Sequence, residues 1–114
     1  MIEKKEIQKQ FRYYDREVVR EIIDLFLQTY KEKLELLHSS IAANDLEQVN
    51  MHAHSLKGLA GTFMAQETQA LAAKMEEMAR NNYSAGLHEL FDRLDASTHV
   101  MAGDLEVIRD EFYS

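Results

Sequence analysis

The chain has 114 residues, a net charge of −7 and no cysteine. This length suits one domain with its own core, while the lack of cysteine excludes zinc–thiolate sites and thiol nucleophiles. An acidic balance argues against nucleic-acid binding, which depends on clustered Lys and Arg. Because no apolar run approaches the roughly 20 residues of a membrane span and no secretory leader opens the chain, we expect one cytoplasmic domain over residues 1–114, without membrane insertion.

The composition predicts helices throughout. The chain contains no proline and only four glycines, which favours long, unbroken helices. No segment shows the alternation of apolar and polar residues that is typical of a strand. We therefore expect an all-α protein.

The first part of the chain predicts a short leading helix followed by a long one. Ile7, Phe11 and Tyr14 have helical spacing and suggest a short helix folded over one end of the molecule. An apolar stripe with a period near 3.6 then predicts a helix from about Asp15 to Ala43. Its members are Val19, Ile23, Phe26, Tyr30, Leu34, Leu37 and Ile41.

A second long helix is predicted to begin after a break at Asn44 and Asp45. Asp45, with Gln48 three residues later, resembles a capping box, in which the two residues satisfy backbone N–H groups at a helix start. The stripe of this helix comprises Val49, Ala53, Leu56, Ala60 and Phe63. A short connection over residues 62–66 leads to the next helix.

Two further helices complete the expected fold. The third carries Leu71, Met75 and Met78 and ends at residues 81–82. Ser84 is the predicted N-cap of the fourth, whose stripe comprises Leu87, Phe91, Leu94, Thr98, Met101, Leu105, Ile108 and Phe112. Four amphipathic helices joined by short loops predict an antiparallel up-down-up-down four-helix bundle, with the short N-terminal helix added.

The stretch HSLKGLAGTF, residues 54–63, contains two glycines within a predicted helix, each costing roughly 1 kcal/mol relative to alanine. At 100° per residue, His54, Lys57, Gly58 and Gly61 share one strip turned away from the apolar stripe. The glycines would clear an approach to the imidazole, a competent nucleophile when neutral. Lys57 would stabilise an anionic group such as phosphoryl. Alternatively, the glycines mark close helix packing and the histidine is inert.

The segment AHSLKG, residues 53–58, resembles the signature of histidine-containing phosphotransfer (HPt) domains. The residues before it, AANDLEQVNM, and the helical architecture are similar too, so the resemblance covers nearly the whole chain. It implies a four-helix bundle in which His54 is reversibly phosphorylated, Lys57 gives electrostatic support and Gly58 provides clearance. It also implies that Glu76 accepts a hydrogen bond from Nδ1–H of His54, which would leave Nε2 free to attack.

The same resemblance implies a docking surface for partner proteins near His54. The expected docking residues are Asn50, Gly58, Gly61 and Met64. The segment KGLAGTF is also similar to the phosphorylation domains of chemotaxis kinases. One departure from the family is Met64, because many members have a glycine ten residues after the histidine.

The function expected from this resemblance is that of a phosphorelay intermediate. His54 would accept a phosphoryl group from a receiver-domain aspartate and pass it to another receiver, with a hybrid sensor histidine kinase upstream. The chain would be a carrier rather than an enzyme and would need no cofactor of its own, because the receiver brings Mg²⁺. Two alternatives stay open: the phosphorylation domain of a chemotaxis-type kinase, and a helical interaction module without phosphate chemistry that dimerises through its last helix.

The remaining histidines do not predict a metal site. His52 and His54 point about 160° apart on a helix, and His88 and His99 are separated by roughly 16 Å along the predicted helix axis. His38 stands alone near a helix end. No glycine-rich phosphate loop is present, so we do not expect the chain to bind ATP.

Overall fold

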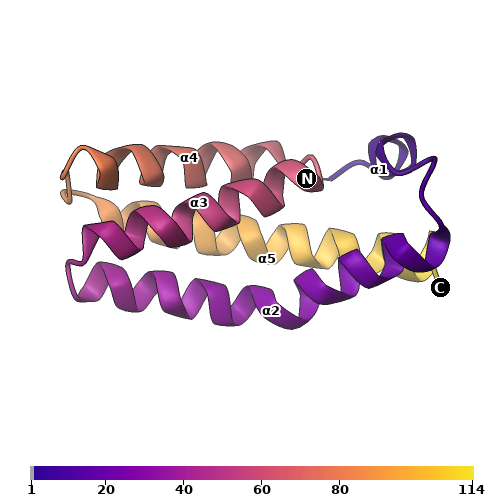
Figure 1. Cartoon of the computed structure of the whole chain (residues 1–114), viewed down its shortest axis with the longest axis horizontal. Helices are drawn as coiled ribbons and strands as arrows, with labels where there is room; N and C mark the ends of the chain where they lie inside the picture. The colour runs from indigo at the N-terminus through magenta and orange to yellow at the C-terminus, as the bar shows by residue number, and fades with distance from the viewer. Residues whose placement is uncertain (1) are drawn as a thin grey trace.

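The computed structural model describes residues 2–114, which form five helices and no strand. These are α1 (Lys4–Gln10), α2 (Arg16–Ala42), α3 (Leu46–Thr62), α4 (Gln66–Arg80) and α5 (Leu87–Phe112). The four long helices run antiparallel along an axis of 41 Å, and α1 lies across one end (Figure 1). The predicted all-α bundle with an extra N-terminal helix is confirmed. Within the described part of the chain, no helix combines the length and apolar character needed to cross a bilayer.

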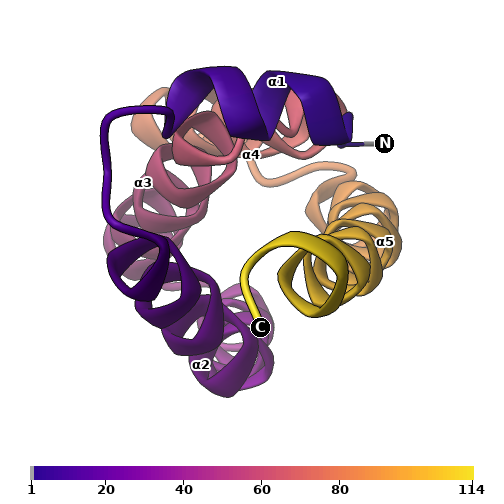
Figure 2. The same ribbon diagram turned by 90° about the vertical axis from the view of Figure 1, so that its right-hand side faces the viewer.

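The long helices form a ring in which each packs against two others. α3 contacts α2 and α4, and α5 closes the ring by contacting the same two helices (Figure 2). The α3–α4 pair therefore lies across the bundle from the α2–α5 pair. The predicted stripes supply the core: its largest fully buried side chains include Phe26, Phe63, Leu37, Leu56, Met75, Leu94 and Leu105. Burial of these apolar surfaces is the main source of stability in such a fold.

Helix α1 closes the bundle at the turn between α3 and α4. Ile7 and Phe11 are buried, and the Phe11 ring lies 6.3 Å from the ring of Phe63. The predicted helix folded over one end is thus confirmed. The prediction for Tyr14 is wrong, because its side chain is 55% exposed. Since α1 ends at Gln10, Tyr14 no longer follows the helical spacing that would point it at the core.

Two polar contacts tie the N-terminal segment to α5. The backbone N–H of Ile2 donates to the Asp104 carboxylate at 2.9 Å, and the Lys4 ammonium lies 2.6 Å from the Glu111 carboxylate. The second pair is about half exposed on both sides, so it contributes little by itself. The buried apolar side chains, rather than this ion pair, hold α1 in place.

Three helices end in the same way, with a residue in the left-handed conformation. The φ angles are +52° at Asn44 after α2, +58° at Met64 after α3 and +55° at Asn82 after α4. After α3, the N–H of Met64 donates to the carbonyl of Gly61 and the N–H of Ala65 to that of Ala60. This is the Schellman arrangement. Asparagine tolerates it better than methionine does.

We expect Met64→Gly to stabilise the fold. Glycine avoids the cost of about 1–2 kcal/mol that a residue with a side chain incurs in the left-handed conformation. Because glycine is more flexible in the unfolded chain, part of this stabilisation is lost. The net effect should be about 0.5–1 kcal/mol, seen as a rise in Tm of a few degrees by calorimetry. Asn82→Gly is the matched control and should change Tm less. A fall in Tm for Met64→Gly would mean that packing of the methionine side chain outweighs the strain.

The helix starts agree with prediction at one position and not at another. The Asp45 carboxylate accepts from the N–H of Gln48 at 3.2 Å, as predicted. The reciprocal half of the capping box is not needed, because the N–H of Asp45 donates to the carbonyl of Ser40. The prediction of Ser84 as N-cap is wrong: Gly86, with φ +82°, precedes α5. The left-handed backbone of Gly86 turns the chain into the helix two residues later than expected.

Candidate functional site

His54 lies in the middle of α3 and points outward. Its neighbours Ala53 and Leu56 are buried, so the inner face of the helix is fixed and the His54 side chain is left 71% exposed. Its Nδ1 contacts the Oε2 atom of Glu76 on α4. Within residues 2–114, Nε2 of the same ring makes no hydrogen bond. One ring nitrogen is therefore held while the other remains accessible.

The Glu76 side chain is only 9% exposed, although it carries a carboxylate. Its second oxygen, Oε1, accepts a hydrogen bond from the Lys57 ammonium at 2.7 Å. The Arg80 guanidinium lies 3.9 Å from the same oxygen, one helical turn further along α4. Burial of a carboxylate is costly unless cations and hydrogen-bond donors compensate it. Lys57 and His54 from α3, and Arg80 from α4, provide that compensation.

The charge state of Glu76 determines which nitrogen of His54 is free. The hydrogen bond from Lys57 lowers the pKa of Glu76 below its ordinary value of 4.5; burial acts in the opposite direction, and the His54 contact lowers the pKa further. Glu76 is therefore ionised at neutral pH and can only accept hydrogen bonds. Neutral His54 must then carry its proton on Nδ1, with the lone pair on the exposed Nε2.

We expect Lys57→Ala to cost about 2 kcal/mol of unfolding free energy at pH 7, since a hydrogen bond to a buried charged group is lost. The folded-state pKa of Glu76 lies below the unfolded value of 4.5. The stabilisation is therefore present above pH 4.5 and disappears as pH falls through the folded pKa. Urea unfolding at pH 7 and near pH 3 should show the difference between wild type and variant shrinking in acid.

Lys74→Ala is the matched control for this experiment, because Lys74 is an exposed lysine of α4. Its removal should change the unfolding free energy by less than about 0.5 kcal/mol at either pH. An equal loss at both pH values for Lys57→Ala would contradict the electrostatic explanation. It would assign the effect to packing of the lysine stem instead.

The structure divides the predicted solvent strip into two parts. His54 and Gly58 are exposed, and a Cβ atom built on Gly58 would meet nothing within 4 Å. Lys57 and Gly61 are half-buried, and a Cβ on Gly61 would lie 2.9 Å from Nε2 of Gln69. The placement of Lys57 and Gly61 on a solvent-facing strip is therefore wrong. Both turn toward α4, because on the helical wheel Lys57 and Gly61 lie on the side of the strip nearer the apolar stripe.

Of the other two predicted docking residues, Asn50 lies on the same helix near His54 and Met64 lies apart from it. Asn50 is half-buried one turn before His54. Met64 lies beyond the end of α3, where it borders a surface hollow together with Glu6 and Lys9 of α1. The structure thus brings together His54, Lys57, Glu76 and Gly58, with Asn50 one turn away, but not Met64.

Two residues around His54 were not predicted from the sequence. Arg80 follows Glu76 by four residues, a spacing that places both on one helical face, and this signal could have identified it. Met51 precedes His54 by three residues and is 53% exposed. An exposed methionine beside an exposed histidine offers apolar contact area for another protein.

The expectation that His38 stands alone is also wrong. Its ring lies 5.1 Å from the ring of Phe91 and 6.4 Å from that of His88, both centroid to centroid. The contact joins α2 to α5, and a pattern within one helix cannot reveal it. His99, further along α5, receives a contact from the Tyr30 hydroxyl of α2, 3.3 Å from its Nδ1.

Comparison with protein families matches residues 21–110 to the Hpt domain. The matched range includes the four long helices almost completely, together with His54, Lys57 and Glu76. No curated protein and no solved structure matched the chain. Because the family match covers far more than half of the sequence, the chain belongs to the Hpt domain family.

Proposed function

We propose that this protein is a phosphorelay intermediate that accepts a phosphoryl group on Nε2 of His54 from a receiver-domain aspartate and passes it to a second receiver. The observation that carries this proposal is the contact between Nδ1 of the exposed His54 and the carboxylate of the buried Glu76. This contact orients the ring and leaves a nucleophilic nitrogen facing solvent.

The proposed transfer begins with attack by the Nε2 lone pair on the phosphorus of an aspartyl phosphate. The P–N bond forms while the P–O bond to the aspartate breaks, and the aspartate leaves as a carboxylate. The ring becomes positively charged, and its Nδ1–H stays hydrogen-bonded to Glu76, whose negative charge offsets that of the ring. In the second transfer, a receiver carboxylate attacks the phosphorus and the ring leaves as neutral imidazole.

Lys57 and Arg80 have an indirect part in this proposal. Both contact Oε1 of Glu76, so they keep that carboxylate ionised and fixed rather than meeting the phosphoryl group themselves. This differs from the expectation that Lys57 supports the phosphoryl group directly. We propose that the receiver supplies the Mg²⁺ and most of the catalytic groups, and that this chain acts as a carrier that needs partner domains for catalysis.

The surface around His54 suits the approach of a globular partner. Gly58, one turn after the histidine, leaves open space beside the ring, and Met51, one turn before it, exposes an apolar side chain. A receiver must bring its aspartyl phosphate within bonding distance of Nε2. A flat surface without large side chains near the ring permits this close approach.

The test is a transfer assay with a panel of receiver domains, each charged with labelled acetyl phosphate. We expect at least one receiver to lose its label to this protein as phosphate that is stable to base and labile to acid. A second sample receives labelled ATP and the catalytic domain of a chemotaxis-type kinase, without a receiver. Labelling in that sample alone would replace the relay proposal with that of a kinase phosphorylation domain. No labelling in either would favour an interaction module.

A further inference from the structure

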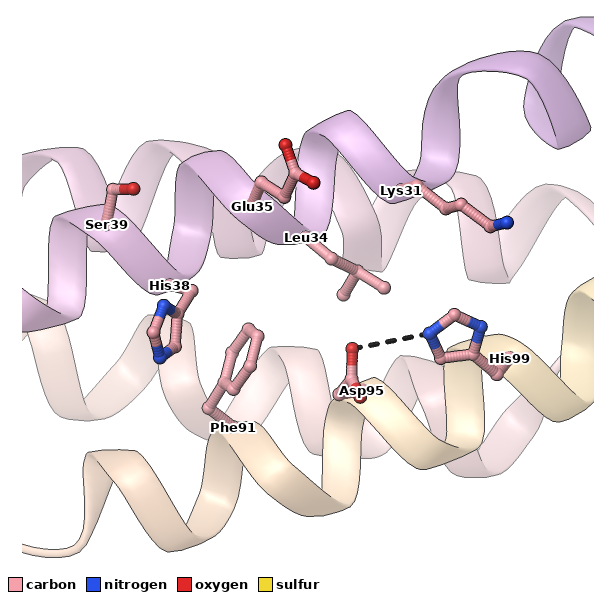
Figure 3. Close-up of a pocket in the computed structure, with 8 residues that line it drawn as sticks. All are labelled: Lys31, Leu34, Glu35, His38, Ser39, Phe91, Asp95 and His99. Atoms are coloured by element: carbon pink, nitrogen blue, oxygen red, sulfur yellow. Dashed lines mark ion pairs between the residues drawn. The ribbon is translucent and has the colours of Figure 1, made fainter.

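A groove of about 600 Å³ lies between α2 and α5 (Figure 3). Because these helices lie across the bundle from α3 and α4, the groove faces away from His54. Its floor contains Leu34 and Phe91, which are only 4% and 8% exposed. The walls are polar. The complete lining is Lys31, Leu34, Glu35, His38, Ser39, Phe91, Asp95 and His99.

Carboxylates outnumber ammonium groups in this lining. Asp95 points into the groove, where its Oδ1 atom lies 3.5 Å from Nε2 of His99 (Figure 3). Glu35, on the α2 wall, forms no ion pair with any residue in 2–114. The lysine of the lining, Lys31, lies at one end of the groove (Figure 3). The centre therefore combines an apolar floor with an incompletely balanced negative charge.

Two other uses of this groove do not fit its geometry. The residues from 2 to 114 contain no group of three or more His, Asp or Glu side chains that could hold a metal ion. Nor can His99 serve as a second phosphoryl acceptor in the manner of His54. One of its nitrogens lies near the Tyr30 hydroxyl and the other near Asp95, so no nitrogen is left free.

We propose that the groove binds a small organic cation, a protonated amine carried on an aromatic or aliphatic body. The body packs on Leu34 and Phe91, and the ammonium group interacts with Asp95, with Glu35 adding negative charge from the opposite wall. Sites of 300–1,000 Å³ with an apolar floor and a few polar groups are typical for small ligands. Since His54 faces the other side of the bundle, the bound cation and a docked receiver do not compete for space.

The experiment uses three probes with the same aromatic body and different charges: phenethylammonium, 2-phenylethanol and 3-phenylpropionate. Each is titrated into the ¹⁵N-labelled full chain, and backbone amide shifts are followed by NMR. We expect phenethylammonium to produce saturable shifts in residues 31–39 and 91–99, with a Kd of about 1 mM, as befits a ligand of this size. The alcohol should bind at least about tenfold more weakly, and the carboxylate should not bind measurably.

Variants then locate the charge that binds the ammonium group. Asp95→Asn should weaken phenethylammonium binding about tenfold, and Glu35→Gln should weaken it less. Glu77→Gln removes the same charge from an exposed position on α4 and should leave the Kd unchanged. Equal binding of the cation and the alcohol would overturn the assignment of a cation. Absent shifts, shifts elsewhere on the bundle, or an equal loss in Glu77→Gln would overturn the site itself. None of these results depends on phosphotransfer.

Discussion

His54→Gln should reduce phosphoryl transfer from a charged receiver to background, a loss of at least about 100-fold, because the only nucleophilic nitrogen at the site is removed. Glutamine retains an amide that can hydrogen-bond to Glu76, so the buried carboxylate is not left without this partner. The His54 side chain is 71% exposed. Its replacement should therefore change the unfolding free energy by no more than about 0.5 kcal/mol.

His52→Gln is the matched control for this variant. His52 lies on the same helix, two residues away, and is half-buried, so it shares the local sequence but not the contact with Glu76. The His52 variant should accept phosphate at the wild-type rate. Labelling that persists in His54→Gln, or disappears in His52→Gln while the fold is intact by circular dichroism, would contradict the assignment of His54.

The second large effect is expected for Gly58→Gln. A Cβ on Gly58 meets nothing within 4 Å, so the larger residue should fold normally and even gain up to about 1 kcal/mol from its higher helix propensity. Its side chain would, however, project beside His54, one turn along α3, and occupy the space that an approaching receiver needs. We expect transfer to fall at least about tenfold with an unchanged or higher Tm. Gly58→Ala should gain a similar stability with a smaller loss of transfer.

Gly103→Gln supplies the control for a large side chain at an open helical glycine. Gly103 lies on α5, and a Cβ there also meets nothing within 4 Å, so the stability gain should be similar while transfer is unaffected. A lower Tm for Gly58→Gln would show that this face packs against something in solution. Normal transfer with a normal Tm would show that receivers do not approach past Gly58.

The helices were predictable because their apolar stripes have one consistent period. The stripe from Val19 to Ile41 on α2, and that from Val49 on α3 to its C-cap Phe63, are buried at every expected position. The helix starts were less predictable, since the N-cap of α5 depends on the left-handed backbone of Gly86. Nothing in the polar character of Ser84 distinguishes it from a true cap. Tyr14 failed for a related reason, because a turn interrupts the helical spacing after Gln10.

The site was predictable to the extent that it lies on one helix. The spacing of His54 and Gly58 along α3 places them on an open face, and the structure exposes both. Contacts between helices were different. The partner of Lys57 lies 19 residues away on α4, and Gly61 faces Gln69 of the same helix. Periodicity fixes how a helix is oriented toward the core but not which side chains of a neighbouring helix lie at its edges.

The buried carboxylate behind His54 has a consequence for how long the protein would stay phosphorylated. Once Nε2 carries phosphate, the ionised Glu76 favours the form of the ring that keeps its proton on Nδ1. A ring that keeps its Nδ1 proton leaves as neutral imidazole, which is a better leaving group than the imidazolate anion. The P–N bond therefore breaks readily when an acceptor carboxylate attacks the phosphorus. On the proposed mechanism the phosphorylated chain therefore transfers its phosphoryl group quickly once an acceptor binds, and the supply of acceptors sets how long the phosphorylated form lasts.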